Sequence, residues 1–182
     1  MKTICVFLAD GFEEVEALTV VDVLRRIGIS VETVSIMKSK TVMGAHDVPI
    51  VADKLFEDIK QDNVEMIVLP GGMPGATNLD SHVGLSKLIK EFAESAKPLS
   101  AICAAPMVLG KRGILNNKKA TCYPGFEKFL HGAAYTNALV QKDGNIITGK
   151  GPGAAMDFAF TIAEQYVGLA KVKEVRKGMI VE

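Results

Sequence analysis

The segment Pro98-Leu99-Ser100-Ala101-Ile102-Cys103-Ala104-Ala105-Pro106 decides how the chain folds. Its apolar residues 99–102 predict a buried strand, and residues 106–111 have a helical pattern. A strand that passes through a tight turn into a helix holds the turn residue, Cys103, at the carboxyl end of a sheet. Backbone N–H groups and the positive end of a helix dipole lie there, and both favour the thiolate, which is the reactive form of cysteine.

The turn around Cys103 has small residues where a nucleophile elbow usually has glycine. Ala101 and Ala105 lie two positions before and after the cysteine, and small side chains suffice where bulk would clash. A buried cysteine is otherwise most often a structural residue. Here the strand–turn–helix setting favours a nucleophile over that alternative.

Strand and helix patterns alternate on both sides of this segment. The predicted strands and helices are residues 2–9, 29–37 and 64–69, and residues 10–28, 82–96, 154–167 and 170–177, respectively. We expect Asp10 to cap the first helix, with Glu13 at the capping-box position, and Gly28 to end it. The remaining expected elements are an irregular hairpin at 38–53, a short helix at 55–60, a short strand at 119–122, a helix or loop at 125–130, and a hairpin that joins 138–141 to 145–148.

This alternation predicts one α/β domain over residues 1–182, with a mostly parallel sheet between two layers of helices. The chain is 48% hydrophobic and 23% charged, as is typical of a globular protein, and 182 residues are too few for two ordinary domains. In such sheets, ligands bind at the carboxyl ends of the strands, where the strand order reverses.

Charge and apolar runs argue against several classes of protein. The 21 basic and 21 acidic residues form no block of like charge, so neither nucleic acid nor an anionic membrane is an expected partner. No run approaches the ~20 apolar residues of a membrane span, and residues 4–9 are too few for the core of a signal peptide. Three cysteines at no metal-like spacing argue against a zinc site or a disulfide scaffold and predict a reducing, cytoplasmic location.

Glu16 interrupts an apolar stripe of the first predicted helix. Its neighbours at helical spacing are all apolar, namely Phe12, Val20, Val23 and Ile27. Burial raises the pKa of a carboxyl group, so a protonated Glu16 would be able to donate a hydrogen bond to a cysteine thiolate. The alternative is an acid that stabilises the helix dipole, and Glu13 and Glu14 fit that role better because they lie nearer the helix start.

Gly71 and Gly72 follow the third predicted strand and allow backbone N–H groups to approach a ligand oxygen, as an oxyanion hole requires. The N–H of Ala104, directly after the cysteine, would be the second donor. A plain tight turn also explains two adjacent glycines, but their place beside a cysteine elbow favours the oxyanion role. Cys122 and Tyr123 end a short strand and either line this site or pack in the core or at the rim.

Other candidate sites are weaker. Residues 149–153, Gly-Lys-Gly-Pro-Gly, lie between a strand and a helix, but Met156 replaces the last glycine of a dinucleotide-binding pattern. We therefore interpret them as a structural turn with close backbone packing. His46, His82 and His131 lie in no metal motif and are expected at the surface, so we expect no metal site.

Four segments together resemble the ThiJ/PfpI superfamily, and within it the branch of the parkinsonism-associated redox protein and its bacterial relatives. These segments, in register over nearly the whole chain, are Ala9–Glu16, Val68–Gly72, Ala101–Pro106 and Gly151–Gly153. The resemblance implies a flavodoxin-like fold, which is a three-layer α/β/α sandwich, and a homodimer. It makes Cys103 an easily oxidised nucleophile, Glu16 its protonated hydrogen-bond partner, and Gly72 and Ala104 the oxyanion donors.

The resemblance also implies two classes of function. Family members have been assigned glyoxalase activity on methylglyoxal, repair of glycated protein and nucleotides, and oxidative-stress or chaperone roles. We therefore expect either a cysteine-dependent glyoxalase or deglycase that needs no metal or organic cofactor, or a non-enzymatic redox sensor or chaperone with an oxidisable Cys103.

The chain departs from the family pattern at three positions. Relatives carry histidine where this chain has Tyr123, and tyrosine donates hydrogen bonds but is a poor base near neutral pH. Relatives also have arginine near the dimer interface where His46 stands. The peptidase branch has histidine directly after its cysteine, whereas Ala104 follows here, so a cysteine peptidase would lack its base.

The first predicted helix is apolar on a second face as well. That face carries Val15, Leu18, Val21 and Leu24. Because one face of the helix packs on the sheet, the second needs another cover, and a second subunit would provide it.

Overall fold

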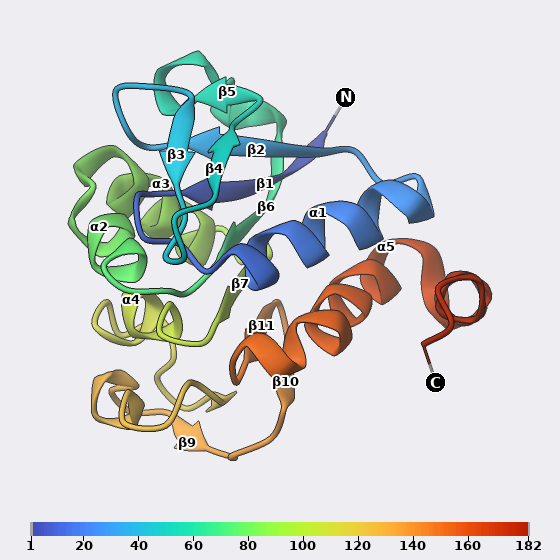
Figure 1. Cartoon of the computed structure of the whole chain (residues 1–182). Coiled ribbons are helices and arrows are strands. Elements are labelled where there is room, and N and C mark those ends of the chain that lie inside the picture. Colours follow the sequence, from blue (N-terminus) through green and yellow to red (C-terminus); the bar gives the residue numbers. More distant parts are fainter. Residues whose placement is uncertain (1, 182) are drawn as a thin grey trace.

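The computed structural model describes residues 2–181 and has three layers (Figure 1). A seven-stranded sheet forms the middle layer, in the order β10-β11-β7-β6-β1-β2-β5. Its strands are β1 (Thr3–Leu8), β2 (Val31–Ser35), β5 (Lys54–Leu55), β6 (Val64–Leu69), β7 (Leu99–Ile102), β10 (Val140–Asp143) and β11 (Ile146–Gly149). Neighbouring strands are parallel except for the antiparallel pair β10–β11. The predicted α/β fold with a mostly parallel sheet is confirmed.

Helices cover both faces of this sheet (Figure 1). On one face, α1 (Glu14–Ile27) packs against α5 (Ala155–Gly178), and the other face carries α2 (Gly75–Ser81), α3 (Val83–Glu94) and α4 (Pro106–Gly110). Gly168 breaks α5 with φ 74° and ψ 166°, which agrees with the prediction of two helices there. None of the helices within residues 2–181 is long and apolar enough to cross a membrane.

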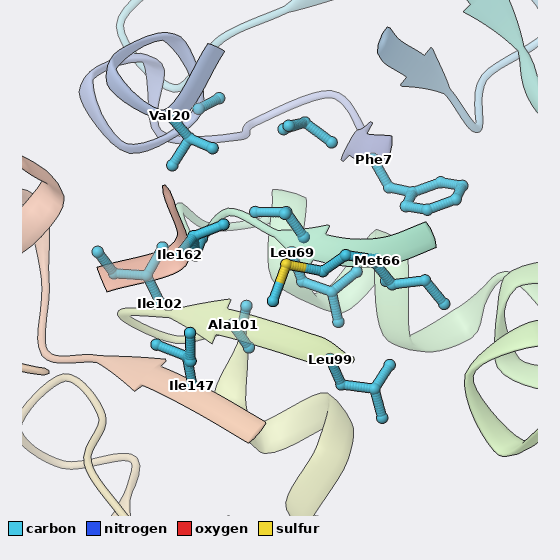
Figure 2. Packing of buried hydrophobic residues seen from close by; sticks show 14 of the residues in the cluster. Phe7, Val20, Met66, Leu69, Leu99, Ala101, Ile102, Ile147 and Ile162 are labelled. Atoms are coloured by element: carbon cyan, nitrogen blue, oxygen red, sulfur yellow. The ribbon is translucent and has the colours of Figure 1, made fainter. Parts of the chain in front are cut away.

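The central strands consist of residues buried between the two helix layers. Every residue of β1 and β7 is buried. Figure 2 shows Leu69 of β6, Leu99 and Ile102 of β7, and Ile147 of β11 in the core that also contains Ile162 of α5. Burying one such side chain stabilises a protein by about 1.5–3 kcal/mol. The middle of the sheet is therefore a firm support for the loops at its carboxyl edge.

The first helix begins later than predicted. It starts at Glu14, and neither Asp10 nor Glu13 caps it with its side chain. Instead, Oδ1 of Asp10 accepts a hydrogen bond from the N–H of Met43 at 2.9 Å, and the N–H of Gly11 donates to the Met43 carbonyl at 2.7 Å. This turn therefore binds the small hairpin made of β3 (Thr41–Met43) and β4 (Pro49–Val51) instead of forming a helical turn.

Several short segments also test the predictions. The hairpin predicted to join 138–141 to 145–148 is present as β10–β11, with its strands shifted by one or two residues. The short helix predicted at 55–60 is present in part, as the 3₁₀ helix Phe56–Asp58 that follows β5 and ends at the extended backbone of Ile59. The predicted strand at 119–122 shortens to β8 (Lys119–Ala120), which pairs with β9 (Ala134–Tyr135) outside the main sheet. The 3₁₀ helices are Phe56–Asp58, Gln61–Asn63, Glu127–Phe129 and Pro152–Ala154.

Candidate active site

Three loops meet at the carboxyl edge of the sheet, because β7, β6 and β1 are neighbours in it. The loop after β7 begins with Cys103, the loop after β6 contains Gly71 and Gly72, and the segment after β1 leads into α1, which carries Glu16. The structure therefore brings together the cysteine, the carboxyl group and the glycines that the sequence predicted as one site.

Cys103 occupies a strained turn. Its φ is 64°, in the left-handed region that a residue with a side chain adopts at a cost of about 1–3 kcal/mol. Two hydrogen bonds hold this conformation. The N–H of Cys103 donates to the Gly149 carbonyl at 2.9 Å, and its own carbonyl accepts from the N–H of Tyr123 at 2.8 Å. The residue is only 8% exposed, so the sulfur is held in a fixed place at the edge of the core.

Glu16 lies fully buried in the first turn of α1. Its Oε2 accepts a hydrogen bond from the N–H of Gly71 at 2.7 Å, and its Oε1 is buried with no hydrogen-bond partner of regular geometry among the described residues. Burial raises the pKa of Glu16 to about 7, against the opposing effect of hydrogen bonding to the Gly71 N–H and to the Cys103 side chain. The carboxyl group thus gains or loses a proton near neutral pH, next to the thiol.

Burial and the neighbouring charge of Glu16 raise the pKa of Cys103 to about 12, while the N–H groups of Gly72 and Ala104 lower it. The expectation that the helix dipole makes this cysteine a thiolate is wrong. The helix that follows it, α4, has only five residues, and a thiolate beside the Glu16 carboxylate would place two negative charges side by side. The thiol and the carboxyl group therefore titrate as a coupled pair that retains one proton. A thiolate forms most easily when that proton lies on Glu16.

The two glycines after β6 have different roles. A Cβ on Gly71 would lie 2.5 Å from the Cβ of Cys103 and 2.7 Å from Oε2 of Glu16, so only glycine leaves the pair in contact. The Gly71 N–H is already bound to Glu16, which corrects the prediction that it binds substrate. Gly72, at φ 83°, directs its N–H to the sulfur instead, as Ala104 does. Gly72 and Ala104 thus direct their N–H groups at the sulfur, as the predicted oxyanion hole requires.

Tyr123 is bound to Cys103 through its backbone N–H. Its side chain is 46% exposed and lines a pocket of about 330 Å³ together with the glycine-rich loop of residues 150–154. Of the two alternatives, Cys122 packs in the core, where it is fully buried. The backbone packs closely where this loop begins, as predicted, since a Cβ on Gly149 at the end of β11 would lie 2.8 Å from side-chain atoms of Ile102.

Two of the three histidines, His46 and His82, have structural partners. Nδ1 of His82 accepts a hydrogen bond from the N–H of Leu85 and caps α3. His46 was expected only as a surface residue, but its ring nitrogen and its backbone N–H bind the two oxygens of Glu14 at 2.8 and 2.7 Å. Glu13 completes a group with metal-ligating atoms within 4.8 Å of one another, in which Glu14 is already fully hydrogen-bonded. The sequence did not predict this group, because His46 lies in the hairpin 32 positions after Glu14.

Comparison with known proteins agrees with this geometry. Residues 2–165 match the family described as DJ-1/PfpI. The chain belongs to the DJ-1/PfpI family. It is 37% identical to Protein dj-1beta of Drosophila melanogaster over 182 residues, which cover 99% of this chain and 97% of that protein.

Solved DJ-1/PfpI structures share the whole fold. A DJ-1 superfamily protein from Salmonella typhimurium superposes with a TM-score of 0.94 at 35% identity, with 100% of both chains covered. Oxidized DJ-1 of Toxoplasma gondii also gives 0.94, at 30% identity, over 100% of this chain and 99% of that one. The flavodoxin-like arrangement implied by the motifs is therefore confirmed.

Replacing Gly71 with alanine tests how tightly the pair is packed. We expect Gly71→Ala to lower the free energy of unfolding by about 1–3 kcal/mol, because a methyl group must fit between Cys103 and Glu16. Alkylation of Cys103 by iodoacetamide, followed by peptide mass mapping, should slow as well. Gly178→Ala is the matched control, since a Cβ there meets nothing within 4 Å. Equal alkylation rates in the two variants would contradict this account of the site.

The raised pKa of Glu16 predicts a pH-dependent stability. An ordinary glutamate has a pKa of 4.5, whereas Glu16 in the folded protein has a pKa of about 7, so its contribution is full below pH 4.5 and is lost as the pH rises through 7. Relative to Glu16→Gln, which does not ionise, wild type should lose on the order of 3 kcal/mol across that range. Urea unfolding of both proteins measures this difference. Parallel pH profiles would show that Glu16 titrates normally.

Proposed function

We propose that this DJ-1/PfpI protein is a cofactor-independent enzyme that converts small reactive dicarbonyls to hydroxy acids through Cys103 and Glu16. The observation that carries the proposal is the contact of a fully buried carboxyl group, with a pKa of about 7, with a cysteine held at positive φ. Repair of glycated protein or nucleotides by the same pair is a variant of this reaction, because it also begins with attack on the carbonyl-derived carbon.

The first step forms the covalent bond. Glu16 takes the proton of the Cys103 thiol, and the thiolate adds to the aldehyde carbon of methylglyoxal. The electron pair of the carbonyl moves to oxygen, where the N–H groups of Gly72 and Ala104 stabilise the negative charge. Protonation of that oxygen by Glu16 gives a neutral hemithioacetal and restores the carboxylate.

The second step is an internal oxidation and reduction of the substrate. The Glu16 carboxylate removes the proton from the former aldehyde carbon and returns it to the neighbouring carbon, and the hydroxyl proton of the first carbon passes to the oxygen of the second, so the first carbon is oxidised and the second reduced. The product is a lactate thioester on Cys103. Water then breaks the C–S bond, and lactate and the free thiol are released. Oε1 of Glu16, which has no hydrogen-bond partner within residues 2–181, is suited to carrying the proton, since the other oxygen stays bound to Gly71.

Methylglyoxal consumption with lactate production tests the proposal. We expect Cys103→Ala to abolish turnover and Glu16→Gln to lower kcat by about a hundredfold or more, because general acid–base catalysis contributes that much. Cys5→Ala removes another buried thiol by the same chemical change and should retain full activity. Full activity in Cys103→Ala would refute the mechanism.

A second candidate function is oxidative sensing or chaperone activity without turnover. The N–H groups that face the sulfur and the adjoining carboxyl group would also hold a sulfinate, and the relative from T. gondii is known in an oxidized form. Absence of a histidine at Tyr123 favours this candidate, because a base used by relatives is missing.

Intact-mass measurement after mild peroxide treatment tests the sensor. The expected result is a gain of two oxygen atoms in wild type and in Cys5→Ala, and none in Cys103→Ala. If Cys103 is not oxidised selectively, the sensor function is excluded.

We also propose a homodimer in a reducing, cytoplasmic compartment, where all three free cysteines would stay reduced. Part of the second apolar face of α1 is buried within one chain, since Val21 and Leu24 are covered. Exposed apolar residues remain at the start of α1 and on the hairpin bound to it, namely Val15, Met43, Val48 and Val51. These side chains are the proposed subunit interface.

Sedimentation velocity tests this interface. Wild type should sediment as a dimer at micromolar concentration and Val51→Glu as a monomer, because Val51 is 72% exposed and a charge there would be buried by a partner. A wild-type monomer would refute the dimer.

A further inference from the structure

The pocket lined by Tyr123 lies directly beside the nucleophile. It has a volume of about 330 Å³, and its lining residues are Tyr123, Pro124, Leu139, Lys150, Gly151, Pro152, Gly153 and Ala154. We call it the Lys150 pocket. Its volume is far larger than a three-carbon dicarbonyl requires, and it lies at the lower end of the range for small-molecule sites.

Two walls of this pocket are attached to the peptide of Cys103 itself. The N–H of Cys103 is bound to the carbonyl of Gly149, which directly precedes Lys150. The carbonyl of Cys103 is bound to the N–H of Tyr123. Gly149 and Ile102 are the last residues of β11 and β7, and they pair with each other. The residues that follow them, Lys150 and Cys103, therefore leave the sheet side by side. A substrate attached to Cys103 therefore has the Lys150 pocket next to it.

Lys150 is the only charged residue among those that line the pocket in the described chain. It is half-buried, and within residues 2–181 its ammonium group has neither an ion pair nor a hydrogen bond. Of the other two half-buried lysines of the described chain, Lys54 is paired with Glu32, whereas Lys118 is also without an ion pair but lines no part of this pocket. Its backbone N–H, bound to the Leu139 carbonyl at 2.9 Å, fixes the start of the side chain at the pocket.

The rest of the lining is mostly apolar. Tyr123 and Leu139 are large side chains that are 46% and 57% exposed in this single chain. A cation that is partly removed from water, has no carboxylate partner and stands among apolar walls is a site for an anion on a short carbon chain.

We infer that the Lys150 pocket binds the non-reacting end of the substrate and that Lys150 selects dicarbonyls that carry a carboxylate a few bonds from the reacting carbons. This inference rests on the proposed function and names its substrate class. Lys150 is a specificity residue, since it binds the far end of the substrate and takes no part in proton transfer.

A matched pair of substrates isolates the charge. We would compare 4,5-dioxopentanoate with 2-oxopentanal, which have the same chain length and differ in the terminal carboxylate. In Lys150→Gln, the ratio of kcat/KM for the anionic over the neutral substrate should fall about three- to fivefold, through KM for the anion. Lys142→Gln, on the exposed part of β10 outside the pocket, should keep the wild-type ratio. An unchanged ratio in Lys150→Gln would overturn the inference.

A second measurement does not depend on turnover. Iodoacetate and iodoacetamide both alkylate Cys103 by displacing iodide, and only iodoacetate carries a negative charge. The ratio of their rates cancels the fraction of thiolate, because both react with the same ionised sulfur. Peptide mass mapping should show that the rate with iodoacetate divided by the rate with iodoacetamide falls about three- to fivefold in Lys150→Gln and does not fall in Lys142→Gln.

The two experiments separate the two ideas. If wild type turns over neither dicarbonyl, but the alkylation ratio falls in Lys150→Gln alone, the proposed enzyme is wrong and the anion site stands. If turnover occurs, and the kcat/KM ratio and the alkylation ratio are each the same in wild type, Lys150→Gln and Lys142→Gln, the proposed enzyme stands and the anion site is refuted.

Discussion

The hydrogen bond from the Gly71 N–H to Oε2 of Glu16 is the interaction on which the site depends. It joins residues 55 positions apart and fixes the loop after β6 to the start of α1. A carboxyl group with no exposed surface would be costly without such a donor. Because this bond holds the carboxyl group beside Cys103, the same arrangement that keeps the acid in the core keeps its proton near the sulfur.

The backbone around Cys103 supplies the second half of this geometry. A residue at positive φ relaxes unless its surroundings over-determine it, and here both polar groups of its own peptide are bound, to Gly149 and Tyr123. These partners come from β11 and from the segment after β8, so the elbow is stabilised by the sheet and not only by its own turn. The firm packing of Leu99 and Ile102 beneath it prevents the strand from shifting (Figure 2).

Local patterns made much of this predictable. The elbow could be predicted because strand, cysteine and helix are contiguous, and the burial of Glu16 because an acid interrupts a helical stripe. Contacts between distant segments could not be predicted. Asp10 is a good capping residue by type, yet Met43 of the hairpin binds it. Gly71 has the right type for an oxyanion donor, yet its N–H belongs to Glu16. In each case a tertiary partner took a group that local chemistry assigned elsewhere.

The attachment of Cys103 to Gly149 has a consequence for the time at which the site forms. The cysteine leaves the ribosome long before β11, so in the nascent chain its sulfur is an ordinary exposed thiol. Pairing of β11 with β7 supplies the carbonyl that holds the elbow, and only then is the side chain shielded and its pKa raised. Completion of the sheet therefore converts Cys103 from an exposed thiol into a residue that is 8% exposed and held at the edge of the core.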